Sequence, residues 1–156
     1  MLKPFILVIA AGATIGLMLP SSRPAAAPVA AAPGGEPVET VLEREENGHF
    51  YVHAYVNGEL VRFLIDTGAS SVALTMADAE RLGIPFKQSQ FEVVGTGASG
   101  PVRGKDVMID SVEIDGKKVA PVQGAVIEGL DISLLGQAYL SRISGVEMSG
   151  GHMILR

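Results

Sequence analysis

The chain has 156 residues, a net charge of −5 at pH 7 and no cysteine. That length allows one small domain, and the lack of cysteine excludes disulfides, thiolate zinc sites and a cysteine nucleophile. The acidic balance also argues against nucleic acid as a ligand, because phosphate binding needs clustered Lys and Arg side chains.

The first 20 residues predict a membrane anchor or a signal peptide. The 16 residues from Pro4 to Leu19 carry no charge, and Lys3 precedes them. As a helix this run is slightly shorter than a bilayer core, so an uncleaved anchor would also need the two residues before Lys3. Alanine triplets at 25–27 and 30–32 would instead suit signal-peptide cleavage. We expect an anchor that crosses the cytoplasmic membrane once, with the following domain on the periplasmic or external side.

Residues 21–37 are rich in Pro and Ala and nearly free of charge, which is typical of an extended linker. Residues 38–156 follow as one domain, in which small and branched apolar residues dominate and tryptophan is absent. This composition favours short β-strands that are joined by tight turns.

A β-hairpin is predicted near the start of this domain. Apolar and polar residues alternate from Phe50 to Val56, which is the pattern of a half-buried strand. Asn57-Gly58 supplies a two-residue turn because both residues tolerate positive φ. The returning strand, Leu60 to Ile65, leads directly into an aspartate.

A short strand and a short helix are expected next. Val72 to Leu74 predicts the strand, and Thr75 with Asp78 resembles a capping box at the start of the helix. Gly83 is placed where it would end that helix.

A second hairpin is predicted around the glycine-rich loop at 95–100. Phe91 to Val94 and the segment that starts at Val102 have strand patterns, so the loop would form a mobile tip. The loop also matches G-x-G-x-x-G, but Pro101 and an alternating strand follow where a dinucleotide-binding motif needs a helix. We therefore expect a hairpin tip and not a nucleotide site.

The rest of the chain predicts further strands and a second helical segment. Asp115-Gly116 marks another hairpin turn, and one or two helical turns are expected within Gln137 to Ile143. Residues 149–151 would turn a final hairpin.

The most informative motif is Asp66-Thr67-Gly68 at the end of an apolar strand. The strand and the tight turn place this carboxylate at a rigid position, and residues 134–136 form an apolar pair followed by glycine before the second helical segment. Together these features resemble the retropepsin-like aspartic proteases, in particular their bacterial, membrane-anchored, single-domain members. The resemblance covers residues 50–156.

The resemblance implies a mostly β fold, namely a small closed β-barrel of the acid-protease type with one or two short helices. It implies that Asp66 is the catalytic aspartate, that the Thr67 hydroxyl forms a hydrogen bond across a dimer axis, and that Gly68 allows close backbone approach. It also implies that residues 134–136 pack against this loop and that residues 91–107 form a flap over the substrate. The candidate substrate-binding residues are Ala69, Thr96, Gly97, Ala98 and Ser99.

Gln137 departs from the viral members of this family, in which a basic residue is common after the glycine. The interface ion pairs that such a basic residue makes are therefore not carried over to this chain. The catalytic chemistry does not depend on them.

Aspartic proteolysis needs two carboxylates that share a proton, one to activate water and one to hydrogen-bond the peptide carbonyl. Asp66 is the only aspartate followed by Thr-Gly or Ser-Gly; the others are Asp78, Asp106, Asp110, Asp115 and Asp131. The second carboxylate must therefore come from another copy, which predicts a homodimer with a twofold axis.

The sequence thus predicts a homodimeric aspartic endopeptidase that hydrolyses peptide bonds in extended protein segments. Its water would be activated by the shared Asp66 dyad, without cofactor or metal. Two alternatives stay open: a catalytically silent protease-like domain that binds peptides or partners, and an anchored structural β-module with an accidental motif. Asp66→Asn distinguishes them, because a protease would lose cleavage while it stays folded and dimeric, whereas a binding module would keep its partner.

Overall fold

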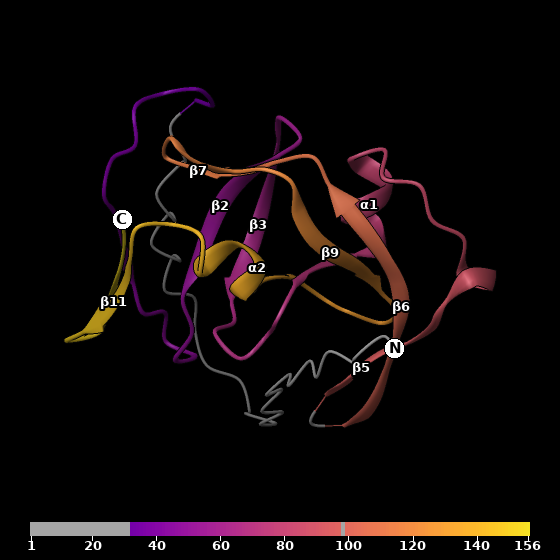
Figure 1. Cartoon of the computed structure of the whole chain (residues 1–156). Coiled ribbons are helices and arrows are strands. Elements are labelled where there is room, and N and C mark those ends of the chain that lie inside the picture. The colour runs from indigo at the N-terminus through magenta and orange to yellow at the C-terminus, as the bar shows by residue number, and fades with distance from the viewer. Residues whose placement is uncertain (1–31, 98) are drawn as a thin grey trace, which may run out of the picture.

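A nine-stranded sheet and a three-stranded sheet form most of this structure, a computed structural model that describes residues 32–97 and 99–156 (Figure 1). The larger sheet has the strand order β5-β6-β9-β4-β10-β3-β2-β7-β8, and the smaller has the order β1-β12-β11. The strand bounds are β1 Thr40–Glu43, β2 Tyr51–Val56, β3 Glu59–Ile65, β4 Val72–Thr75, β5 Glu92–Gly97, β6 Gly100–Ile109, β7 Val112–Ile114, β8 Lys117–Val119, β9 Val122–Ile127, β10 Ser133–Leu135, β11 Val146–Ser149 and β12 His152–Leu155.

Helical structure is limited to short segments. The described residues contain α1 (Met76–Arg81), α2 (Gln137–Leu140) and a single 3-10 turn, η1 (Gln88–Gln90). The first two were predicted, and the 3-10 turn was not. The expected mostly β composition with one or two short helices is confirmed.

Local sequence signals determine the turns and the start of α1. Asn57 and Gly58 have φ values of 51° and 89°, and Asp115 and Gly116 have φ values of 45° and 79°, as two-residue hairpin turns require. Thr75 is the N-cap of α1, where its hydroxyl accepts a hydrogen bond of 3.0 Å from the main-chain N–H of Asp78. These predictions from the sequence are confirmed.

One hydrophobic core lies between the two sheets and the helices. Its fully or nearly fully buried members include Leu42 on β1, Phe63 on β3, Ala79 on α1, Tyr139 on α2 and Met153 on β12. The larger sheet does not close into a barrel, because β5 and β8 remain its two ends and no ladder of the described strands joins them. The smaller sheet therefore packs over the core and completes its enclosure, because the strands of the larger sheet do not form a continuous hydrogen-bonded ring.

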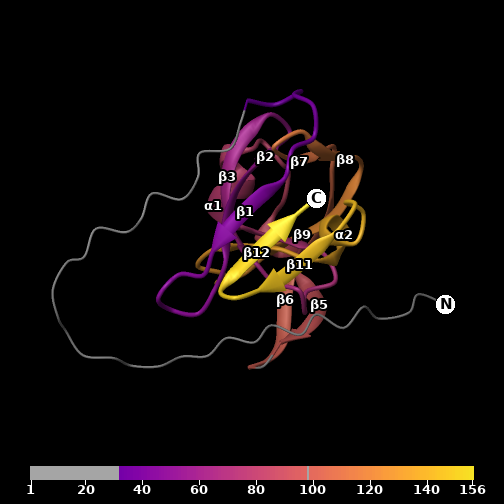
Figure 2. The same ribbon diagram turned by 90° about the vertical axis from the view of Figure 1, so that its left-hand side faces the viewer.

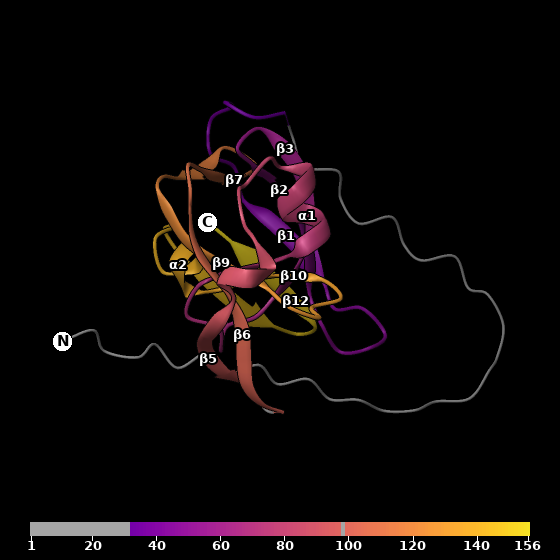
Figure 3. The same ribbon diagram turned by 90° about the vertical axis from the view of Figure 1, so that its right-hand side faces the viewer.

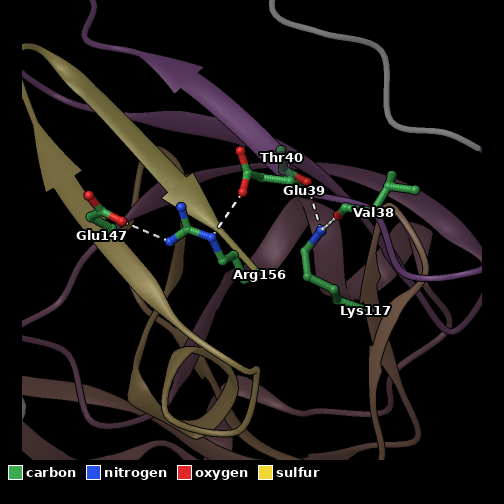
Figure 4. Close-up of polar contacts among 6 residues, drawn as sticks. All are labelled: Val38, Glu39, Thr40, Lys117, Glu147 and Arg156. Atoms are coloured by element: carbon green, nitrogen blue, oxygen red, sulfur yellow. Dashed lines mark hydrogen bonds and ion pairs between the residues drawn. The ribbon is translucent and has the colours of Figure 1, made fainter.

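The smaller sheet joins the first and last strands of the described chain (Figure 2). β1 pairs with β12 in antiparallel register, with Thr40 opposite Leu155. Across the outer face of this sheet Arg156 forms ion pairs of 2.9 Å with Glu39 and 2.8 Å with Glu147 (Figure 4). β1 was not predicted from the sequence.

The segment before β1, residues 34–39, lies on the hairpin formed by β7 and β8; we call it the N-terminal arm. The main-chain N–H of Gly34 donates a 2.6 Å hydrogen bond to the Glu113 carboxylate. The Lys117 ammonium donates to the carbonyl of Val38 and, at 2.8 Å, to the hydroxyl of Thr40 at the start of β1 (Figure 4). Both Glu113 and Lys117 are buried, so the arm covers charged groups that would otherwise face solvent.

The predicted single pass through the cytoplasmic membrane, with the catalytic domain on the periplasmic or external side, is corrected by the structure. Within residues 32–97 and 99–156 no helix has the length and apolar character needed to cross a bilayer. The longest of them, α1, has 6 residues, or about 9 Å at 1.5 Å per residue. Residues 1–20, on which the anchor or signal peptide was predicted, lie outside the described residues, as does most of the expected linker at 21–37.

Candidate active site

The loop of residues 66–71 connects β3 to β4 and begins with the predicted catalytic aspartate. β3 ends in buried Ile65, after which the main-chain N–H of Asp66 donates a 3.1 Å hydrogen bond to the carbonyl of Leu135. The Oδ1 atom of Asp66 accepts a 2.9 Å hydrogen bond from the main-chain N–H of Gly68. The half-buried carboxylate is therefore oriented by its own loop at the end of a buried strand.

β10 supports this loop because it lies between the two strands that the loop connects. β10 pairs in parallel with β3, where Leu134 is opposite Leu64, and antiparallel with β4, where Leu134 is opposite Ala73. The next residue after β10 is Gly136, where a Cβ atom would lie only 2.2 Å from the carbonyl oxygen of Ser71. Only glycine fits at this position, so the expected packing of residues 134–136 against the loop is present.

The first residues of α2 hold the carbonyl groups of the loop. The main-chain N–H of Gln137 donates a 2.8 Å hydrogen bond to Ala69, and that of Ala138 donates a 2.9 Å hydrogen bond to Ser70. The side chain of Gln137 donates a further bond of 2.9 Å from Nε2 to the carbonyl of Thr67. Asp66, Thr67, Ala69 and Ser70 of the loop are thus each hydrogen-bonded to β10 or α2.

The candidate residues of the loop differ in exposure. Ala69 is fully buried, whereas Thr67 and Gly68 are exposed. Ala69 therefore packs beneath the loop, and the Thr67 side chain lies on the surface of the protomer.

A second apolar cluster, separate from the main core, begins two residues before Asp66; we call it the second cluster. It contains buried and partly buried side chains of β3, β4, β5, β6, β9, β10 and the segment between β9 and β10: Leu64, Ala73, Val94, Val102, Ala125, Ile127, Leu130, Ile132 and Leu134. Leu64 lies two residues before Asp66, and Val94 and Val102 belong to the β5–β6 hairpin. Sequence analysis missed this cluster, although the uninterrupted apolar run at 63–65 indicates a strand that is buried on both faces.

The predicted flap is the β5–β6 hairpin, which projects from the rest of the protein (Figures 1 and 3). Thr96 and Gly97 are at the end of β5 and Ser99 is in the turn, while Ala98 lies outside the described residues. These residues belong to the hairpin and not to the Asp66 loop. The second cluster contains side chains from the hairpin and from the strand that leads to Asp66. At its base the hairpin is held by Arg103, which donates to the carbonyl of Phe91 at 3.2 Å and pairs with Glu128 at 3.3 Å.

The glycine-rich segment forms a hairpin tip and opens no helix, which argues against the dinucleotide alternative. In the part of the chain that the structure describes, no group of three or more His, Asp or Glu side chains is placed to hold a metal ion. The site combines the Asp66 carboxylate with a neighbouring apolar cluster.

The chain is similar to known proteins in family, in sequence and in structure. The model of the family described as "gag-polyprotein putative aspartyl protease" matches residues 52–142. The crystal structure of a retropepsin-like aspartic protease from Rickettsia conorii is similar with a TM-score of 0.63 and 34% identity, covering 76% of this chain and 89% of that one. The EIAV protease in complex with the inhibitor HBY-793 is similar in fold, with a TM-score of 0.51, 20% identity and coverage of 64% and 91%. The acid-protease fold is thereby confirmed.

Two curated relatives have uncharacterized activity. One, from Rickettsia prowazekii (strain Madrid E), is 36% identical over 118 residues, which is 75% of this chain and 51% of that protein. The other, from Sinorhizobium sp, is 36% identical over 121 residues, or 76% and 52%. The chain spans about half the length of these curated relatives.

Proposed function

This chain belongs to the retropepsin-like aspartic proteases, and from that membership we propose that it is a homodimeric endopeptidase that hydrolyses peptide bonds in extended protein segments. The observation that carries the proposal is the orientation of Asp66. Its carboxylate lies at the end of β3, accepts the Gly68 N–H at 2.9 Å, and belongs to a loop that β10 and α2 support from beneath.

The proposed reaction uses Asp66 from each of two copies. One carboxylate takes a proton from water, and the resulting hydroxide oxygen forms a bond to the peptide carbonyl carbon. The other carboxyl group, which carries the shared proton, hydrogen-bonds the carbonyl oxygen as its charge develops. Collapse of the tetrahedral intermediate breaks the C–N bond as a proton passes to the departing amine, so that an acid and an amine leave.

The free edge of β11 supports the proposal of a dimer. β11 pairs with β12 on one side, and no other strand of residues 32–97 and 99–156 pairs with it. Val146 and Met148 on this strand are 38% and 52% exposed. An open edge with apolar side chains is a surface that a second copy can cover by antiparallel pairing about a twofold axis.

The second cluster supports the proposal of a substrate with apolar side chains near the scissile bond. Partly buried Leu64, two residues before Asp66, would contact the substrate from one side, and Val94 and Val102 would cover it from the hairpin. An extended peptide laid between them could bond through its main chain to Thr96, Gly97 and Ser99 at the end of the β5–β6 hairpin, which remain proposed substrate contacts. Ala69, which is fully buried, and Ala98, which lies outside the described residues, stay predictions from the resemblance.

The test is cleavage by the purified full chain of a peptide mixture rich in apolar residues, with its mass in solution measured in parallel. Asp66→Asn should lower the rate by about 10²-fold or more, since a positioned acid or base contributes that much, while the dimer mass and the melting temperature stay unchanged. Asp110→Asn, at an exposed aspartate between β6 and β7, is the matched control and should retain full activity. Cleavage that persists in Asp66→Asn would contradict the mechanism, and peptide binding without cleavage in either protein would indicate the silent domain.

A further inference from the structure

We propose that Gln137 is a positioning residue that controls the Asp66 carboxylate through the peptide unit between Thr67 and Gly68. The inference rests on the proposed function and adds to it a residue that does not touch the substrate. Its basis is that two hydrogen bonds meet on one peptide group.

The carbonyl and the N–H of that peptide group face different partners. The Nε2 atom of Gln137 donates to the Thr67 carbonyl oxygen at 2.9 Å. The N–H of the same peptide belongs to Gly68 and donates to Asp66 Oδ1, also at 2.9 Å. The Gln137 amide, the peptide and the carboxylate therefore form a continuous chain of hydrogen bonds.

Such a chain affects both the orientation and the strength of the last bond. A donor on the carbonyl fixes the plane of the peptide, so the N–H keeps its direction toward Asp66. It also polarises the peptide, and hydrogen bonds in series strengthen one another by about 10–30% per bond. Without the Gln137 donor, the exposed peptide could rotate and release the carboxylate from the geometry that the twofold pair requires.

Gln137 can act in this way because α2 is itself held in place. The Tyr139 hydroxyl donates a 2.7 Å hydrogen bond to the carbonyl of Lys117, and Tyr139 and Leu140 are buried in the main core. The main-chain N–H of Gln137 is bonded to Ala69. The side-chain amide thus extends from an element whose position is fixed on both sides.

A purely structural role would have different consequences. A side chain that only stabilises the loop would lower the melting temperature when replaced, and below that temperature the turnover number would be unchanged. A positioning residue changes kcat in the folded enzyme and leaves KM nearly unaffected, because the orientation of the dyad matters most in the transition state.

The test uses the full chain with three substitutions, each assayed well below its melting temperature. Gln137→Met keeps the length of the side chain and removes the donor, and it should lower kcat about tenfold with KM within about twofold. Gln137→Glu places an acceptor against the Thr67 carbonyl and should lower kcat at least as much. Gln137→Lys returns a donor and should recover kcat to within about threefold of the original protein.

Arg142→Met is the matched control. Arg142, just past α2, also donates from its side chain to main-chain carbonyls, those of Pro121 and Ala120, but away from the Asp66 loop. Its replacement should leave kcat and KM unchanged.

The outcomes separate this inference from the proposed function. Equal kcat values for Gln137→Met and the original protein would overturn the inference. The proposed function would still be supported in that case if Asp66→Asn loses cleavage. If the original protein shows no cleavage that depends on Asp66, the proposed function fails, and amide exchange of Gly68 decides the inference by itself. In Gln137→Met the amide of Gly68 should exchange about tenfold faster than in the original protein, when both rates are taken relative to the amides of β3. An unchanged exchange rate would overturn the inference.

Discussion

The hydroxyl of Tyr139 donates a 2.7 Å hydrogen bond to the main-chain oxygen of Lys117, and this bond connects α2 to β8 in the protein interior. Burial raises the pKa of the Tyr139 phenol far above its ordinary value, because the ionised form would lose its hydration. The same connection is what holds α2 against the Asp66 loop.

Stability should therefore fall in alkaline solution. In the unfolded chain Tyr139 releases its proton near pH 10, whereas in the folded protein it keeps it. The contribution is fully present below pH 10, and above it the free energy of unfolding should drop by about 1.4 kcal/mol per pH unit. Urea denaturation between pH 8 and pH 11 measures this slope.

Tyr139→Phe should remove the contribution of Tyr139 to this slope. At pH 7 it should also lower the free energy of unfolding by about 1–3 kcal/mol, since the Lys117 carbonyl loses its donor. An unchanged slope in this variant would contradict the assignment.

Replacing Lys117 should release the N-terminal arm. Burial lowers the pKa of the Lys117 ammonium, although Asp115 and Glu39 act in the opposite direction, so the charge is costly to bury and its hydrogen bonds offset that cost. Lys117→Met should lower the free energy of unfolding by about 1–3 kcal/mol, because Val38 and Thr40 lose their donor. Limited proteolysis should then cut residues 34–39 faster. The exposed neighbour provides the control, and Lys118→Met should change neither quantity.

Gly136→Ala should damage both stability and activity. The added Cβ would meet the carbonyl oxygens of Ser71 and Ala69 at 2.2 Å and 2.5 Å, so the Asp66 loop must move. Overpacking of this kind costs about 1–3 kcal/mol, which thermal or urea denaturation detects. Gly145→Ala is the matched substitution, because no atom lies within 4 Å of its added Cβ. Equal losses in the two variants would show that the loop accommodates a side chain.

A charge on β11 should weaken the proposed dimer. Met148 is 52% exposed at the open edge of the three-stranded sheet, and Met148→Asp would place two like charges near the twofold axis. The dimer dissociation constant should rise at least about tenfold, or about 1.4 kcal/mol, in sedimentation measurements. Met108→Asp is the control, since Met108 is 62% exposed on β6. Equal dissociation constants for the two variants would place the dimer contact elsewhere.

The parts of the fold that could be predicted are those that depend on neighbouring residues. Asn57-Gly58 predicts its turn because the required φ values belong to those two residues, and Asp66 stands out because its strand and its turn are adjacent in sequence. The parts that could not be predicted depend on distant pairing. β1 lies before a charged run and is a strand because β12, at the other end of the chain, pairs with it.

The same distinction applies to the candidate site. The Asp66 loop and the hairpin at 95–100 could be found from local motifs. The bond from Gln137 to Thr67 joins residues that are 70 positions apart, and nothing in either local sequence specifies it. The second cluster also contains side chains from seven separate segments, so only the assembled sheet brings them together.

The contacts of the N-terminal arm have a practical consequence for anyone who expresses this protein. A fragment that starts at Val38 would lack Gly34, the donor to Glu113, and Glu36, whose carbonyl lies against Gly116, and would leave a buried carboxylate open to water. An affinity tag fused at Val38 would lie next to the hairpin of β7 and β8, which the shortened chain would leave exposed. Crystallisation and labelling would be better served by fragments that begin at or before Pro33.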